Sequence, residues 1–303
     1  MTLFDPDLAA DPPVGEGPGP AGAQPRAGPR PRREGPRGEL PGLTTRLRLD
    51  VSYDGAGFRG FAAQPGQRTV AGELAAAVTT VVGHPVELVC AGRTDAGVHA
   101  TGQVVHVDVR PGTDTVRLVR SVNSLVGPAV VLRSATVAPP GFDARRSALA
   151  RCYRYLVLEA PGPDPLLAPL SWHVAGPLDL RAMRSGADAL LGEHDFRAFC
   201  RRVPGTAPGT PIPRRVLDAR FSEVPVGAGD LVEGARLLRF DIEATSFCHQ
   251  MVRSVVGVLV DIGRGRRRVS DVIGLLRSGD RAGGGNVIAP PQGLCLTRVD
   301  YPA

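Results

Sequence analysis

The chain has 303 residues, of which 43% are hydrophobic, a length that suits roughly two domains of about 150 residues each. No run approaches the ~18 apolar residues of a membrane helix, and the start lacks the basic and apolar blocks of a secretory signal. These features argue against a membrane protein and predict a globular, cytoplasmic one.

The basic side chains are all arginine, because the sequence contains no lysine. Residues 1–44 contain five arginines and six acidic residues, so the rest of the chain carries 31 arginines and 24 acidic residues. This positive excess favours a polyanionic partner, since the planar guanidinium suits phosphate and stacks on bases. The alternative is an ordinary solvated surface with no such partner.

Composition divides the chain into three parts. Residues 1–44 are rich in proline, glycine and arginine and poor in bulky apolar residues, which predicts a disordered leader. The turn-rich stretch APGPDPLLAPL then separates an N-terminal α+β half at 45–160 from a C-terminal α+β half at 161–303.

The N-terminal half begins with RLRLDVSYD, in which apolar residues alternate as in a strand at 46–54. Thr69 is expected to cap the helix that follows. The further expected elements are a helix at 69–83, strands at 86–92 and 103–109, a helix at 114–126, and strands at 129–137 and 150–160. The last of these strands places Tyr153, Tyr155 and Val157 on one face.

Similar elements recur in the C-terminal half. They are a helix at 179–192, strands at 214–224 and 235–244, an apolar helix at 249–263, a helix at 269–279 and a strand at 293–301. Two halves of this kind predict an α+β fold of two ferredoxin-like units rather than one doubly wound sheet. Each half is expected to have a mostly antiparallel sheet backed by helices, with an active-site cleft between the halves.

The stretch CAGRTDAGVHATGQVVHVDV places Arg93 and Asp95 in a turn between two apolar β segments. Asp95 is an ordinary turn residue that can bond its own backbone two residues on, and Gly97 can supply a positive φ. A carboxylate presented from the rigid edge of a sheet is also well placed for chemistry. The turn alone does not decide between these readings.

A reactive carboxylate in a partly dehydrated site must stay ionised, and for that it needs a cation nearby. Arg93 is two residues away, and Arg253 lies on the apolar helix, one turn from His249. An arginine on such a helix is costly to bury unless a carboxylate pairs with it. Asp95 and Arg253 are therefore candidates for an ion pair, although sequence spacing does not show that they meet.

A competing motif is the G-x-G-x-x-G of Gly55, Gly57 and Gly60 in YDGAGFRGF, which raises the possibility of a nucleotide-dependent oxidoreductase. In that class the third glycine opens a helix, so that the pyrophosphate meets the helix N-terminus. Here Phe61 leads into AAQPGQR, and the helical pattern resumes only near Val70. The context therefore disfavours a dinucleotide site.

The histidines do not form a recognisable catalytic or metal pattern. His194 and Asp195 are neighbours in GEHDFRAF, where a structural cap or turn is the simpler interpretation. His99, His106 and His249 lack metal-ligand spacing and are interpreted as hydrogen-bonded core or surface residues.

The cysteines are odd in number and widely spaced, and no two of them form a C-x-x-C motif. They are Cys90, Cys152, Cys200, Cys248 and Cys295. This spacing argues against a disulfide framework and a zinc site and predicts reduced core residues.

Four blocks together resemble one family. AGRTDAGVHATGQVVH, FDARRSALARCYRY, SFCHQMVR and APPQGL occur in this order, after YDGAGFRGF and QRTVAGEL. Over about residues 45–303 the chain is similar in these blocks to the tRNA pseudouridine synthase A family, and G-R-T-D-A-G-V-H is the most specific of them. The leader lies outside the resemblance.

The resemblance implies that a homodimer isomerises uridine to pseudouridine at positions 38, 39 and 40 of the tRNA anticodon stem-loop, with no cofactor and no metal. It implies that Asp95 is the catalytic aspartate, with Arg93 its neighbour in the motif. It also implies that Tyr153 lies against the target uracil and that Arg253 pairs with the aspartate. Whether Asp95 attacks C1′, abstracts a 2′ proton or adds to C6 stays open.

The chain departs from the family pattern at three positions. Asp143 stands where the family commonly has histidine, Arg146 where it has a second phenylalanine, and Ala71 where glutamine is frequent. These departures concern peripheral RNA contacts. An alternative of another class is an RNA-binding module or tRNA-folding factor that has lost catalysis, which a substitution of Asp95 would favour, but the aspartate is present.

Overall fold

The computed structural model describes residues 43–201, 205, 207, 209–225, 233–280 and 287–302. Contacts between Cα atoms divide the chain into two units, Met1–Glu39 and Leu40–Ala303. The first unit lies outside the described residues, as does nearly all of the leader expected at 1–44.

The second unit alternates strands and helices in the described part of the chain. Its elements are β1 (Thr45–Tyr53), α1 (Val70–Val82), β2 (Val89–Cys90), β3 (His99–Val109), α2 (Thr115–Val126), β4 (Val130–Val137), β5 (Ala150–Glu159), β6 (Trp172–Val174), α3 (Leu180–Asp188), β7 (Gly192–Asp195), η1 (Arg197–Phe199), β8 (Pro213–Glu223), β9 (Arg236–Ala244), α4 (Met251–Gly263), α5 (Ser270–Ser278), η2 (Pro291–Gly293) and β10 (Leu294–Asp300). None of these helices combines the length and the apolar character needed to cross a membrane.

Most of the elements expected from the sequence are present. The Thr69 side chain accepts a hydrogen bond from the Gly72 amide and caps α1, as expected. α3 ends at Asp188, four residues early, because the chain turns there and residues 192–195 form the short strand β7. β2 has only two residues, since pairing with β3 is limited to Val89 and Cys90.

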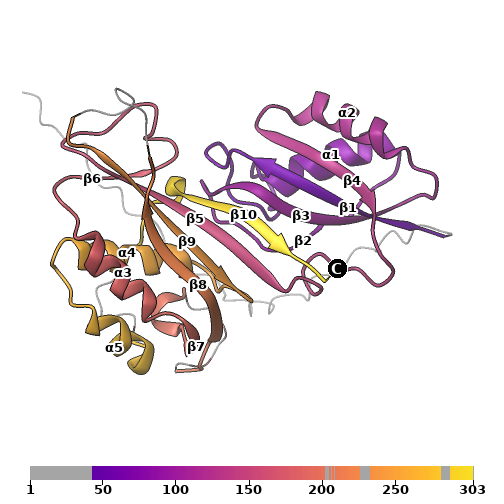
Figure 1. Ribbon diagram of the computed structural model, residues 1–303. Helices are drawn as coiled ribbons and strands as arrows, with labels where there is room; N and C mark the ends of the chain where they lie inside the picture. The colour runs from indigo at the N-terminus through magenta and orange to yellow at the C-terminus, as the bar shows by residue number, and fades with distance from the viewer. Residues whose placement is uncertain are drawn as a thin grey trace, which may run out of the picture. The chain divides into compact units, whose positions relative to one another are not determined.

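The strands form one sheet in the order β4-β1-β3-β10-β5-β9-β8-β7, with β2 and β6 off this path (Figure 1). Pairing is antiparallel except between β10 and β3 and between β5 and β6. The expected α+β class, with a mostly antiparallel sheet backed by helices, is confirmed. The two expected sheets are joined into one, because the last strand, β10, lies between β3 and β5.

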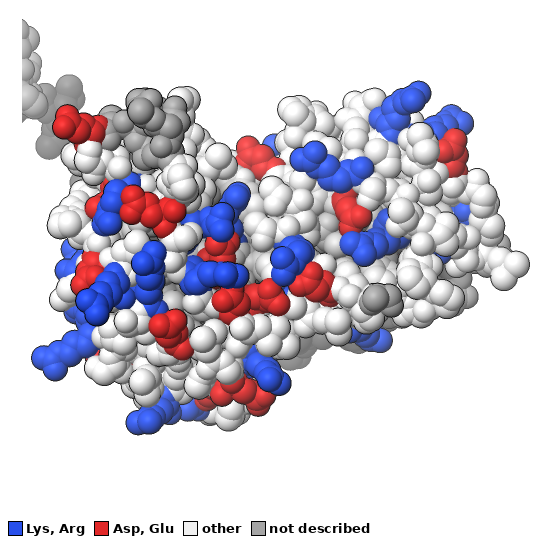
Figure 2. All heavy atoms as spheres, in the orientation of Figure 1, with Lys and Arg blue, Asp and Glu red and all other residues white. Residues whose placement is uncertain are grey.

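The two faces of the sheet differ in chemistry. Tyr155 of β5 is fully buried in the apolar cluster that also contains the helices, whereas its neighbour Arg154 points to the opposite face. On that face Arg298 pairs with Glu243 at 3.0 Å and with Asp300 at 2.8 Å. Figure 2 shows basic and acidic side chains intermixed over β5, β9 and β10. The apolar face therefore holds the fold together, and the other face is polar.

Candidate active site

The loop between β2 and β3 carries Asp95, and buried groups hold its backbone. Gln103 donates from Nε2 to the Gly92 carbonyl at 2.8 Å, and the hydroxyls of Tyr53 and Thr94 are 2.8 Å apart. The Phe61 amide donates to the Thr94 carbonyl at 3.1 Å. Side chains from β1 and β3 thus fix the residues on the N-terminal side of Asp95.

Arg151 ties the same loop to the FDARRSALARCYRY block. Its buried guanidinium donates to the carbonyls of Ala91 at 3.0 Å, Arg145 at 2.7 Å and Thr245 at 2.8 Å. Desolvation lowers the pKa of Arg151, but four backbone carbonyls, the fourth that of Ala148 at 3.1 Å, accept hydrogen bonds from its guanidinium. This arginine joins the Asp95 loop, the start of β5 and the end of β9 in one network.

The glycines of YDGAGFRGF let two loops pack together. A Cβ on Gly55 would overlap the Val98 carbonyl, and Gly60 adopts a φ of 97° beside Thr94. α1 begins only at Val70, so Gly60 does not open a helix as a dinucleotide fingerprint requires. The glycines therefore allow this turn to pack closely against the Asp95 loop. The turn does not lead into a helix N-terminus, so it does not form the dinucleotide site that the oxidoreductase alternative requires.

Asp95 and Arg253 meet, although 158 residues separate them in the chain. Nη1 of Arg253 lies 3.1 Å from Oδ2 of Asp95, and Nε2 of His249 lies 3.2 Å from Oδ1. The arginine side chain is 14% exposed and the aspartate 23%. The Asp95 carboxylate thus faces two basic groups, while the turn itself is closed by the Val98 amide and the Asp95 backbone carbonyl.

The APPQGL segment orients Arg253. Its Nε donates to the Ala289 carbonyl at 2.7 Å, and the Ala289 amide donates back to the Arg253 carbonyl at 3.1 Å. Pro291 lies against Gly97, which has a φ of 78°, as expected for the turn. One segment therefore contacts both the Asp95 loop and the arginine that pairs with it.

His249 was interpreted from sequence as a core or surface histidine, and this interpretation missed its contact with Asp95. Gln250 has a φ of 66°, a left-handed conformation that is uncommon for a residue with a side chain. This turn comes just before α4 and places His249 outside the helix, where its ring reaches the carboxylate. Its position one turn before Arg253 was the available signal.

Arg93 differs from Arg253 in its surroundings. It is exposed, and within the described ranges no ion pair or side-chain hydrogen bond involves its guanidinium. The cation at Asp95 is therefore supplied by α4, not by the neighbouring arginine of the motif. Arg93 remains free to meet an anion from solvent.

Tyr153 lies on the buried face of β5, with its side chain 8% exposed. Its ring centroid is 5.1 Å from that of Phe247, edge to face. Burial, followed by the negative charge of Asp95, raises the pKa of the Tyr153 hydroxyl, so this group is neutral at physiological pH. The Tyr153 hydroxyl thus lies close enough to Asp95 for the carboxylate charge to contribute to its raised pKa.

We expect Tyr153→Phe and Tyr153→Ala to separate the roles of ring and hydroxyl. Phe should bind anticodon-arm RNA as well as Tyr, whereas Ala should lose ~1–3 kcal/mol of base stacking. If the hydroxyl also relays the C5 proton, the Phe variant should bind normally and stall after glycosidic cleavage. Binding and tritium release from C5-labelled uridine measure both effects. If neither substitution changes either quantity, Tyr153 is a core residue only.

The expectation that all cysteines are reduced is wrong for two of them. The structure joins Cys200 and Cys248 in a disulfide, with their Cα atoms 5.7 Å apart. The Arg201 amide also donates to the His249 carbonyl at 2.9 Å, so the two segments run together. Their separation of 48 residues hid the pair in the sequence. The link fastens the loop that presents His249 to Asp95.

A cluster on the polar face of the sheet has metal-binding chemistry. The ligand atoms of Cys152, Glu243 and Asp300 lie within 4.8 Å of one another. Arg298 pairs with both carboxylates, and desolvation followed by the Glu243 hydrogen bond raises the pKa of the Cys152 thiol to about 12. A neutral thiol and an arginine in this position fit an ion-pair network on the sheet.

His194 and Asp195 have the structural role expected of them. The Asp195 carboxylate accepts from the amides of Arg197 at 3.1 Å and Ile212 at 2.9 Å. His194 contacts the Leu191 carbonyl at 2.8 Å through Nε2. The Asp195 contacts close the turn between β7 and η1 and join it to the segment before β8, and the His194 contact joins β7 to the residue before it.

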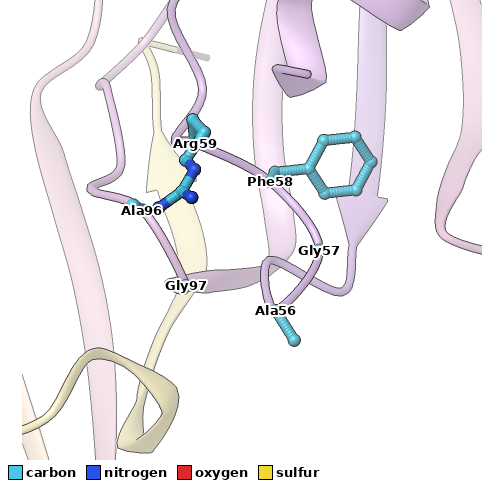
Figure 3. Close-up of a pocket in the computed structure, with 6 residues that line it drawn as sticks. All are labelled: Ala56, Gly57, Phe58, Arg59, Ala96 and Gly97. Carbon is cyan, nitrogen blue, oxygen red and sulfur yellow. The ribbon is translucent and has the colours of Figure 1, made fainter. Parts of the chain in front are cut away.

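A pocket of about 360 Å³ lies directly beside the Asp95 loop. It is lined by Ala56, Gly57, Phe58, Arg59, Ala96 and Gly97 (Figure 3). Ala96 and Gly97 directly follow Asp95 in the chain, so the pocket adjoins the loop that carries the carboxylate.

The comparisons with known proteins agree on one class. Residues 187–302 match a family model described as tRNA pseudouridine synthase. The tRNA pseudouridine synthase A of Frankia casuarinae is 44% identical over 261 residues, covering 85% of this chain and 89% of that protein. The tRNA pseudouridine synthase A of Cutibacterium acnes is 41% identical, covering 86% of this chain and 90% of that protein. That of a Methylobacterium species is 43% identical, covering 85% of this chain and 98% of that protein. The chain belongs to the tRNA pseudouridine synthase A family.

Proposed function

We propose that the chain isomerises uridine to pseudouridine at positions 38, 39 and 40 of the tRNA anticodon stem-loop, with Asp95 as the catalytic carboxylate. The observation that carries this proposal is the geometry at Asp95, whose two oxygens face Arg253 and His249 beside a buried tyrosine. Family membership supplies the reaction and the substrate class.

The reaction requires three changes in the nucleotide. The bond between N1 and C1′ breaks, the uracil turns, and C5 bonds to C1′. C5 then loses its proton and N1 gains one, so the product is an isomer of the substrate. No electron is gained or lost overall, so a redox cofactor has no part in the balance, and we propose that the reaction is cofactor-free and metal-free.

Each site residue has a proposed role in this reaction. Asp95 attacks C1′, abstracts the 2′ proton or adds to C6, three steps that all need an ionised carboxylate. Arg253 pairs with that carboxylate and holds it in place. Tyr153 stacks on the uracil once it is flipped from the RNA, and Arg93 contacts the substrate from the exposed side of the loop.

The test is tritium release from anticodon-arm RNA labelled at C5 of uridine. We expect the purified chain to release one tritium for each pseudouridine formed, because C5 exchanges its hydrogen for the bond to C1′. RNA in which positions 38–40 are cytidine is the matched control and should release none. Tight binding of the RNA without release would favour the noncatalytic RNA-binding alternative instead.

We also propose that the chain works as a homodimer. The family resemblance supports this. Light scattering of the purified chain measures the mass, and a monomer at micromolar concentration would contradict the proposal.

Two further assignments stand as proposals. A cytoplasmic location is supported by a tRNA substrate, and cell fractionation tests it. The division into halves at 45–160 and 161–303 is supported by the site, since Asp95 comes from the first half and Arg253 from the second. Proteolysis confined to the 161–170 stretch would support this boundary.

A further inference from the structure

The pocket beside Asp95 is formed by two loops whose positions are fixed. The Arg59 amide donates to the Arg68 carbonyl at 2.8 Å, and the Phe61 amide bonds the Asp95 loop. Phe58 is 3% exposed, and the Arg68 guanidinium lies 4.4 Å from its ring centroid. The Gly55–Gly60 turn is therefore held on both sides, and the pocket is preorganised.

The charge in the pocket is positive. Figure 3 shows the Arg59 side chain extending from its loop toward Ala96, on the opposite wall. Arg59 is exposed, and within the ranges that the structure describes its guanidinium has no acidic partner. The nearby Arg68 is instead neutralised by Glu73, with Nε 2.6 Å from Oε1. Arg59 is thus the cation left to meet a ligand.

The backbone adds further donors. No hydrogen bond from the amides of Gly57, Ala96 or Gly97 is found within the described residues. Amides and a guanidinium gathered around a small concave site favour an anion with several oxygens. A phosphate group fits this chemistry better than a carboxylate, because it offers more acceptors to donors from two walls.

RNA carries such an anion close to the reacting carbon. The ribose whose C1′ reacts carries phosphates through its 5′ and 3′ oxygens, a few bonds from that carbon. With the target nucleotide at Asp95, a phosphate is therefore within reach of the residues that follow Asp95 in the loop. Ala96 and Gly97 are two of those residues, and both line the pocket.

We propose that this pocket binds the RNA phosphate next to the target uridine, with Arg59 as its charged ligand and the amides of Gly57, Ala96 and Gly97 as its neutral donors. The inference rests on the proposed function, because it requires the target nucleotide at Asp95. Its effect is to fix the register of the strand, so that the correct ribose faces the carboxylate.

The test combines an arginine variant with a neutral RNA linkage. The full-length chain and its Arg59→Gln variant are compared for binding to fluorescent anticodon-arm RNA by anisotropy at several salt concentrations. We expect the variant to bind about tenfold more weakly, and the slope of log Kd against log salt to fall by about 0.7–1. KM should rise by a similar factor, with a much smaller change in kcat. Arg120→Gln, an exposed arginine on α2, is the matched control and should change neither quantity.

The partner atom is identified with methylphosphonate RNA, made once at the 5′ and once at the 3′ linkage of the target uridine. At one of these linkages the neutral group should weaken binding about tenfold in the wild type and less than about twofold in Arg59→Gln. Independent effects at both linkages would overturn the proposal, as would an unchanged salt slope. Wild-type tritium release is measured in parallel, so a failure of this site is distinguished from a failure of the proposed function.

Discussion

Asp95→Asn is expected to lower tritium release from anticodon-arm RNA by about 1000-fold or more. The amide keeps the shape of the side chain but removes the charge, so it is neither a nucleophile nor a base. RNA affinity should stay within a few-fold, because Asp95 lies between two basic groups and is not expected to hold the phosphates. Single-turnover assays and anisotropy measure the two quantities.

Asp195→Asn is the matched control for this prediction. Asp195 is also 23% exposed and also pairs with an arginine, Arg197, at 3.0 Å. It differs from Asp95 in its place in the fold, where it closes a turn. We expect turnover within about threefold of the wild type for this variant. Turnover within tenfold of the wild type for Asp95→Asn would remove the catalytic assignment of that residue.

The secondary structure could be predicted largely from local pattern. Apolar alternation identified β1, and the capping side chain of Thr69 marked the start of α1. The errors lie where local pattern is weak. β6 has three residues and β7 has four, which is too short for an alternating apolar pattern to be recognised in the sequence. Their extended conformation depends on pairing with β5 and β8.

The joining of the sheet could not be predicted, because it depends on long-range pairing. β10 is the last strand of the chain, yet it pairs with β3 through Cys295 and Leu296 and with β5 along most of its length. The alternating apolar pattern of a strand does not indicate which strands it pairs with. The mostly antiparallel pairing and the helices that back the sheet were therefore predicted correctly, whereas the prediction of a separate sheet in each half was wrong.

The site was predictable in part, through chemistry rather than through distance. A buried arginine on the apolar α4 called for a carboxylate, and Asp95 was the plausible one. Whether they met depended on the whole fold. The contact of His249 with Asp95 could not be predicted, because it depends on the left-handed conformation of Gln250. The pocket that Arg59 lines could not be predicted either, because two loops form it.

Arg253→Met is expected to lower kcat/KM by about 100-fold, which corresponds to about 2.7 kcal/mol of transition-state free energy. Methionine fills similar space on α4 but leaves the partly buried Asp95 carboxylate without its ion-pair partner. The carboxylate is then no longer held in place by the guanidinium, so kcat should fall while KM changes little. The measurements are kcat at saturating RNA and kcat/KM at limiting RNA.

Arg267→Met serves as the matched control for Arg253→Met. His249→Gln measures how much the second basic group at Asp95 contributes to kcat/KM. Arg267 is 17% exposed and pairs with Asp261 at 3.7 Å, past the far end of α4. Its loss should cost stability without lowering kcat in the folded protein, because Arg267 pairs with Asp261 and not with Asp95. His249 is 46% exposed, so water replaces it more readily and its variant should fall between the other two. If Arg253→Met keeps the wild-type kcat, the pair with Asp95 only supports the fold.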